Sequence, residues 1–245
     1  APEQLPTGPG PIASGKVVAP ILLYHHIAET RPASRYSVSP ADFERQMKHL
    51  KSWGYTTISL GALSDALQGS GNLPERPLII TFDDGYQDVY QNAFPVMQQL
   101  GFTGVVYVIT GQIKSNGTLN VDELKAMIAA GWEVGSHSRS HLDLRTTGLD
   151  LNAEIAGSRE KLEKLLDTPV LTFSFPYGLT SPAATRLVRS SGYQTAVGVG
   201  GLFTHSEKMR YYLSRLEVQG GLGLPAFARL LPWSDANQPP IQPTN

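Results

Sequence analysis

The chain has 245 residues, of which 41% are hydrophobic and 17% charged, as expected for one large α/β domain or two small ones. The net charge of −1 gives no support to nucleic acid or an anionic membrane as the main partner, and no apolar run approaches the roughly 20 residues that span a bilayer. Because the chain contains no cysteine, it has no disulfides, thiolate ligands or cysteine nucleophiles.

The two ends of the chain differ in composition from the middle. Residues 1–15 contain four prolines and three glycines, and residues 234–245 contain three prolines without apolar periodicity. These segments predict a disordered linker and a disordered tail. A folded domain is therefore expected over residues 16–233. The chain begins without an initiator methionine, so either a signal segment has been removed or the sequence has been trimmed.

Short apolar runs alternate with amphipathic stretches through the middle of the chain, which is typical of strands and helices that follow one another. The apolar runs predict strands at 17–24, 55–60, 77–82, 103–109, 132–136, 170–175, 193–199 and 211–218. The amphipathic stretches predict helices at 40–53, 60–68, 87–100, 121–130, 150–166 and 180–191. This repetition favours an α/β fold with a parallel sheet, and seven or eight units favour a barrel.

Capping signals support the ends of several predicted helices. Ser39-Pro40 and Ser181-Pro182 each place an N-cap serine before a proline suited to the first helical turn. A glycine follows four of the helical stretches, where a left-handed C-cap favours it: Gly54, Gly101, Gly131 and Gly192. In parallel barrels the chemistry lies at the carboxyl ends of the strands, so a functional motif should directly follow an apolar run.

Two adjacent carboxylates, Asp83 and Asp84, close the apolar run 77–82 and precede Gly85. Neighbouring carboxylates repel each other, so keeping both ionised requires a cation or a different role for each. The alternative is structural, with one aspartate capping a helix and the other forming a turn. Position alone does not choose between these interpretations.

His137 and His141 follow the predicted strand 132–136. Residues at i and i+4 share a face of a helical turn, so both imidazoles can reach one ion. A histidine pair of this kind can also lie at a surface without a ligand. Together with the aspartate pair at an equivalent strand end, it predicts a metal site with one carboxylate, two imidazoles and open coordination positions.

Two further strand ends carry candidate residues. Phe175, Pro176 and Tyr177 follow the strand at 170–175, although Pro-Tyr-Gly can also be a simple turn. His25 and His26 close the first apolar run, where a histidine facing the barrel mouth could serve as an acid or a base. One of these two histidines is expected to be structural. His49 in a polar helix and His205 in a charged loop are assigned no role.

The segments TFDDGY, SHSRSH and FPYG, in this order and at strand ends, resemble the polysaccharide deacetylase family, the family-four carbohydrate esterases, over roughly residues 17–218. The resemblance implies a single-domain, distorted (β/α) barrel of about seven strands. It also implies one divalent metal ion, with Zn²⁺ expected and Co²⁺ or Ni²⁺ as alternatives, and removal of acetyl from N-acetylglucosamine units. By position, the resemblance implies that Asp83 is the general base. It implies that the metal ligands are Asp84, His137 and His141.

The same resemblance gives candidates for substrate binding. Phe175, Pro176 and Tyr177 would line the sugar groove, and the backbone N–H of Tyr177 would help to hold the oxyanion. The family's third motif usually begins with an arginine that orients the base, and Ser174 stands in that place here. Arg215 is a candidate for the missing arginine and is grouped with the substrate-binding residues.

The position of the general acid is a second departure from the family. The Leu-x-His motif that usually supplies it late in the chain is absent there, and residues 21–25 look like that motif moved to the front. This order resembles the permuted subgroup that deacetylates poly-β-1,6-N-acetylglucosamine. We therefore prefer His25 to His26 as the acid.

The resulting expectation is metal-assisted hydrolysis of the N-acetyl groups of an extracellular polysaccharide or oligosaccharide, by an exported protein with peripheral association at the cell envelope. Poly-β-1,6-N-acetylglucosamine is the preferred substrate. The alternatives are deacetylation of peptidoglycan, chitin or acetyl-xylan, and a carbohydrate-binding barrel with weakened catalysis. The Ser174 departure is the only feature that favours the binding barrel.

Overall fold

A computed structural model describes residues 15–30 and 32–235 of the chain. Most of the predicted linker and tail therefore lies outside the described residues. The folded part extends two residues past the predicted boundary at residue 233, because Ser234 is buried and Asp235 accepts a hydrogen bond from the Trp53 indole over 2.8 Å. Among the described residues, none of the helices combines the length and the apolar character needed to cross a bilayer.

The strands are short and mostly follow the predicted runs. They are β1 (Lys16–Val18), β2 (Ile21–Tyr24), β3 (His26–Ile27), β4 (Ser37–Val38), β5 (Thr56–Thr57), β6 (Pro77–Phe82), β7 (Val105–Val108), β8 (Glu133–Ser136), β9 (Thr172–Ser174), β10 (Thr195–Val197), β11 (Thr204–Ser206) and β12 (Leu216–Glu217). Strand β6 has the bounds that its continuous apolar run predicts, as expected for a strand covered on both faces.

The helices alternate with these strands. They are α1 (Pro40–Ser52), α2 (Leu60–Leu67), α3 (Phe94–Gln99), α4 (Val121–Ala129), α5 (Leu151–Glu154), α6 (Ala156–Leu166), α7 (Pro182–Ser190) and α8 (Leu224–Arg229), with a π-helical turn η1 (Val89–Ala93) and 3₁₀ turns η2 (Pro176–Gly178) and η3 (Glu207–Met209). The predicted caps are confirmed. The hydroxyls of Ser39 and Ser181 accept from the third residue beyond each, and the four glycines have φ between 70° and 88°.

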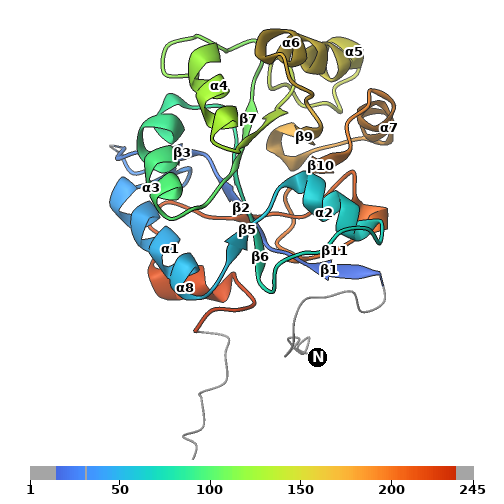
Figure 1. The fold of residues 1–245 in the computed structure, drawn as a ribbon. Coiled ribbons are helices and arrows are strands. Elements are labelled where there is room, and N and C mark those ends of the chain that lie inside the picture. The colour runs from blue at the N-terminus through green and yellow to red at the C-terminus, as the bar shows by residue number, and fades with distance from the viewer. Residues whose placement is uncertain (1–14, 31, 236–245) are drawn as a thin grey trace, which may run out of the picture.

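The central sheet is parallel and has the strand order β10-β9-β8-β7-β6-β2-β12, with β5 paired to β6. Its two edges approach each other through residues 213–217. Leu213 forms a parallel bridge with Val197 of β10, and Leu216 pairs with Leu22 of β2. The curled sheet confirms the predicted α/β fold, a distorted (β/α) barrel in one domain (Figure 1).

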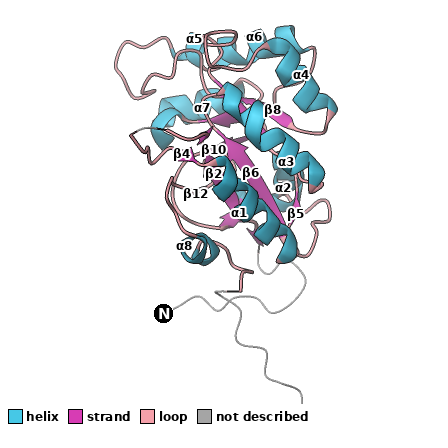
Figure 2. Cartoon of the chain, turned by 90° about the vertical axis from the view of Figure 1, so that its left-hand side faces the viewer, coloured by secondary structure: helices cyan, strands magenta, loops and turns pink. Residues whose placement is uncertain are grey.

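The two faces of β6 pack into two different hydrophobic clusters. Leu78, Ile80 and Phe82 belong to the larger hydrophobic cluster, which packs under the outer helices, whereas Ile79 belongs to a second cluster with residues of α2. Figure 2 shows α1 and α3 covering the outer face of the strands. Because successive side chains alternate between faces, Thr81 and the residue that follows the strand, Asp83, continue the inward set.

Three predicted elements are interrupted. The predicted strand 17–24 divides at Pro20 into β1, which pairs with β11, and β2, which enters the central sheet. The predicted helix 87–100 begins with the π-helical turn η1 before α3, near Pro95, which has no N–H for the helical ladder. The predicted helix 150–166 divides at Ile155. Helix α8 was not predicted.

His205 differs from its prediction as a loop residue, because it lies on β11 and is only 1% exposed. Its Nε2 donates to the Ala19 carbonyl over 3.0 Å, and among the described residues its Nδ1 has no hydrogen-bond partner. Burial lowers the pKa of His205 to about 4, against the partial opposition of the Ala19 hydrogen bond. The neutral form is therefore the form that the fold holds.

This burial predicts a loss of stability in mild acid. The folded pKa lies below the unfolded value of about 6.5, so the contribution of His205 is fully present above that pH and falls as pH drops toward 4. The unfolding free energy is measured by urea at pH 7 and at pH 5. Its decrease between the two pH values is expected to be about 1–2 kcal/mol smaller in His205→Asn than in the wild type. An equal difference in both proteins would contradict the assignment.

Candidate active site

Asp83, at the carboxyl end of β6, is buried and held by Arg215. The guanidinium donates from Nη1 to Oδ1 and from Nη2 to Oδ2, each over 2.7 Å, and the Ser174 hydroxyl donates to Oδ2 over 3.1 Å. Burial acts to raise the pKa of Asp83, but the Arg215 guanidinium and then the His137 imidazole hold it well below its ordinary value. The carboxylate is therefore ionised although it is removed from solvent.

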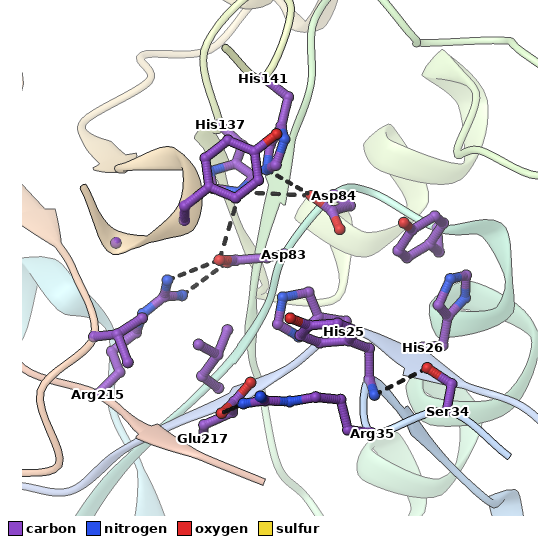
Figure 3. Close-up of a pocket in the computed structure, with 16 residues that line it drawn as sticks. His25, His26, Ser34, Arg35, Asp83, Asp84, His137, His141, Arg215 and Glu217 are labelled. Atoms are coloured by element: carbon purple, nitrogen blue, oxygen red, sulfur yellow. Dashed lines mark hydrogen bonds and ion pairs between the residues drawn. The ribbon is translucent and has the colours of Figure 1, made fainter. Parts of the chain in front are cut away.

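All five N–H groups of Arg215 are used within the protein. Besides the two bonds to Asp83, Nε donates to the Gly198 carbonyl over 2.8 Å, Nη1 to the Thr81 hydroxyl over 3.1 Å and Nη2 to the Ser174 hydroxyl over 2.9 Å. The grouping of Arg215 with the substrate-binding residues is therefore wrong, because no donor is left for a sugar. Its geometry is that of a residue that orients Asp83 (Figure 3).

Asp84 turns away from Asp83 toward the histidine pair. Its backbone has φ of 72° and that of Gly85 has φ of 73°, where a Cβ would lie 2.9 Å from the Val108 side chain. Asp84 Oδ1 is buried, lies 3.5 Å from His137 Nε2 and 3.4 Å from His141 Nε2, and forms no hydrogen bond with the described residues. The ligand atoms of these three residues lie within 4.8 Å of one another.

This donor set fits a divalent metal ion. His137 Nδ1 donates to the Ser174 carbonyl over 2.8 Å, which leaves the Nε2 lone pair directed at the cluster. A buried carboxylate oxygen without a donor is costly unless a cation or a hydrogen bond satisfies it. Asp84, His137 and His141 are therefore the residues that would hold the ion, and two imidazoles with one carboxylate suit zinc and similar transition metals.

The two histidines meet through a tight loop, and the expectation that they share a helical face is wrong. Ser138 and His141 have φ of 64° and 58°, and the Ser138 hydroxyl accepts from the His141 N–H over 3.0 Å. The buried carboxylate of Glu154 accepts from the N–H groups of Arg139 and Ser140 over 3.1 and 2.9 Å and from the Ser140 hydroxyl. Glu154 therefore anchors the loop from the end of α5.

His25 and His26 occupy different environments at the end of β2. His25 lines the same pocket as Asp83 and His137, and its ring lies edge-on to Tyr36 with centroids 5.0 Å apart. Burial lowers the pKa of His25, and the carboxylates of Asp83 and Asp84 oppose that shift. His26 donates from Nδ1 to Asp88 over 2.6 Å. His25 therefore lies near Asp83 in the pocket, whereas Nδ1 of His26 is used in its hydrogen bond to Asp88.

The predicted groove residues divide between the pocket and the core. Tyr177 has φ of 59°, is 62% exposed and lies edge-on to His141, with ring centroids 4.5 Å apart. Phe175 is fully buried against Phe173, so the predicted contact of its side chain with a sugar is wrong. Pro176 is also buried and does not line the pocket. Of this motif, Tyr177 and Gly178 reach the pocket wall.

The pocket has a volume of about 470 Å³ and contains most of the candidate residues. The residues that line it are Leu23, His25, His26, Ser34, Arg35, Tyr36, Asp83, Asp84, Tyr86, His137, His141, Tyr177, Gly178, Val199, Arg215 and Glu217. Sequence reasoning missed Glu154, because an acidic residue in an amphipathic stretch gives no local signal. It also missed Arg35 and Glu217, which come from segments that meet only in the fold.

The sequence profile of the polysaccharide deacetylase family matches residues 70–196, and the chain belongs to this family. It is 29% identical to YxkH of Bacillus subtilis over 209 residues, covering 85% of this chain and 74% of YxkH. It is 24% identical to a poly-β-1,6-N-acetyl-D-glucosamine N-deacetylase of Staphylococcus aureus, covering 79% and 72%. The fold resembles that of BC0361, a polysaccharide deacetylase from Bacillus cereus, with a TM-score of 0.79 and 29% identity, covering 88% of this chain and 69% of that one.

The donor set predicts that metal content depends on the loop histidines. His141→Ala removes one of three ligand side chains, and loss of most of the bound divalent ion is expected when metal content per chain is measured after purification in a zinc-containing buffer. The control is His49→Ala, the same change on α1 outside the pocket. Equal metal content in wild type and His141→Ala would contradict the site.

Proposed function

We propose that this protein is a metal-dependent N-deacetylase that removes acetyl groups from N-acetylglucosamine units of an extracellular polymer, and that poly-β-1,6-N-acetylglucosamine is the preferred substrate. Asp83 is the general base, His25 the general acid, and Asp84, His137 and His141 hold the ion. One observation carries the proposal. An ionised, buried carboxylate, a three-residue ligand set and a histidine on a third strand end line one pocket.

The base has the surroundings that proton abstraction requires. Asp83 is only 3% exposed, and Arg215 keeps it ionised, so it can accept a proton from an attacking water inside the pocket. Its Oδ2 lies 3.6 Å from His137 Nε2, and this short distance to the ligand set supports its role as the base. A divalent ion held by Asp84, His137 and His141 would supply Lewis-acid polarisation of the acetyl carbonyl.

The acid must protonate the amine as it leaves, because expulsion of an amide anion is prohibitive near neutral pH. In Figure 3, His25 lies on the other side of Asp83 from His137 and His141, and it lines the same pocket. Tyr177 lines the wall beside His141, so its backbone N–H is the candidate donor to the oxyanion. Base, acid and oxyanion donor thus come from three different strand ends.

The choice of polymer rests on the position of His25 early in the chain and on similarity to the Staphylococcus aureus enzyme, whose name specifies poly-β-1,6-N-acetyl-D-glucosamine. Chitin, peptidoglycan and acetyl-xylan are the alternative polymers. Such substrates lie outside the cytoplasm, so the proposal includes export and a place at the cell envelope. A carbohydrate-binding barrel without catalysis has less support, because Arg215 supplies the guanidinium that Ser174 lacks.

Acetate release tests the proposed function. Purified protein loaded with zinc is expected to release acetate from β-1,6-linked N-acetylglucosamine oligomers faster than from chitin oligomers, peptidoglycan fragments or acetyl-xylan. A chelator should abolish release, and added zinc should restore it. Binding of the oligomers without acetate release under any metal condition would favour the binding barrel. A faster rate on another polymer would replace the preferred substrate and leave the chemistry in place.

The role of His25 predicts a difference between two leaving groups. His25→Ala is expected to lower turnover of an N-acetylglucosamine oligomer by about 10²–10⁴-fold, because the amine then leaves without a positioned acid. Turnover of 4-nitrophenyl acetate, whose leaving group needs no proton, should fall far less. His26→Ala is the matched comparison at the neighbouring position. An equal loss on both substrates, or a selective loss in His26→Ala, would contradict the assignment.

A further inference from the structure

The pocket extends past the catalytic residues toward a second polar group. Arg35 and Glu217 lie at its far end, beyond His25 and away from His137 and His141 (Figure 3). Tyr36, whose ring lies edge-on to His25, lines the same pocket. None of these residues contributes to the steps described above. They therefore require a different explanation, and their position relative to His25 provides one.

Glu217 is held at this end of the pocket by the sheet. It lies on β12 and pairs in register with Leu23, two residues before His25. Its Oε2 accepts from Arg35 Nη2 over 2.6 Å and from Gln219 Nε2 over 3.0 Å. Among the described residues, Oε1 accepts no hydrogen bond, and the side chain is 20% exposed. One carboxylate oxygen is thus fixed by the protein and the other remains available to a ligand.

Arg35 and Tyr36 lie on a loop that is fixed against the same strand end. The Gly220 N–H donates to the Arg35 carbonyl over 2.8 Å, and a Cβ at Gly220 would lie 2.4 Å from the Ser34 carbonyl oxygen. The guanidinium of Arg35 lies 5.1 Å from the centre of the Tyr36 ring. Tyr36 is 46% exposed, which is unusual for a large aromatic side chain in this protein. Together, Tyr36 offers an aromatic ring face, Arg35 a hydrogen-bond donor and Glu217 a hydrogen-bond acceptor.

The direction of the reaction determines what these three residues would contact. The acetyl carbonyl lies toward Asp84, His137 and His141, and the nitrogen that His25 protonates is bonded to the sugar ring. The ring must therefore extend past His25, toward Tyr36 and Glu217. A pyranose presents hydroxyls to hydrogen-bonding side chains and an apolar C–H face to an aromatic ring.

We infer that Arg35, Tyr36 and Glu217 form the subsite for the hexosamine ring that carries the reacting acetamido group, an inference that rests on the proposed function. Glu217 accepts hydrogen bonds from ring hydroxyls through its available oxygen, Arg35 donates to a hydroxyl oxygen, and Tyr36 packs on the sugar face. Because the ion pair leaves no net charge at this end, the subsite suits a neutral hexosamine.

The experiment compares one acetylated sugar with one acetyl ester that has no sugar. For Glu217→Gln, the ratio of kcat/KM on the N-acetylglucosamine oligomer to kcat/KM on 4-nitrophenyl acetate is expected to fall about tenfold or more, mainly through KM for the oligomer. Arg35→Ala, at a side chain that is 55% exposed, should shift the ratio in the same direction and guards against misfolding of the first variant. Glu44→Gln, which breaks the exposed Glu44–Lys48 pair on α1, is the matched control and should leave the ratio unchanged.

An unchanged ratio in both variants would overturn the subsite, because the residues would then have no selective effect on the sugar substrate. An equal fall in kcat/KM on both substrates would also overturn it, because the residues would then act through the catalytic groups. If the wild type releases no acetate from any oligomer, the proposed function fails separately. Titration calorimetry with the same oligomer then decides the subsite. Binding at least tenfold weaker in Glu217→Gln than in wild type supports it, and equal affinity, or no binding to the wild type, overturns it.

Discussion

The buried ion pair between Arg215 and Asp83 is the constraint on which the rest of the site depends. A charge removed from water requires a partner and further hydrogen bonds, and here the pair has both, through Thr81, Ser174 and Gly198. Arg215 lies in the segment that joins the two edges of the curled sheet, between the bridge at Leu213 and strand β12. The segment that closes the barrel therefore also carries the residue that fixes the Asp83 carboxylate.

The same strand ends direct the remaining groups toward one opening. Asp84, Ser138, His141 and Tyr177 all have positive φ, a conformation that non-glycine residues rarely adopt and that concentrates at functional sites. Each of these turns changes the direction of the chain just past a strand. Glu154 supports one turn by accepting two backbone N–H groups of the histidine loop. These turns therefore bring together side chains that a regular strand or helix would keep apart.

Local patterns predicted the fold well, because caps, apolar runs and strand alternation are properties of adjacent residues. They predicted β6 and the glycine caps, and the motif order indicated the Asp84, His137 and His141 cluster that the structure assembles. Long-range contacts could not be predicted in this way. The contact of Arg215 with Asp83 joins residues 132 positions apart, and that of Arg35 with Glu217 joins residues 182 apart. Burial of Phe175 likewise depends on neighbours such as Tyr212 that its own motif does not contain.

A double-mutant cycle in stability tests the Arg215–Asp83 constraint most directly. Unfolding free energies are measured by urea, with chelator present, for wild type, Asp83→Asn, Arg215→Met and the double variant. Each single change leaves an uncompensated buried group, so Arg215→Met is expected to cost about 3–5 kcal/mol, and the double variant should cost at least ~2 kcal/mol less than the sum of the singles. Costs that add to within ~0.5 kcal/mol would contradict the account, because the two residues would then stabilise the fold independently.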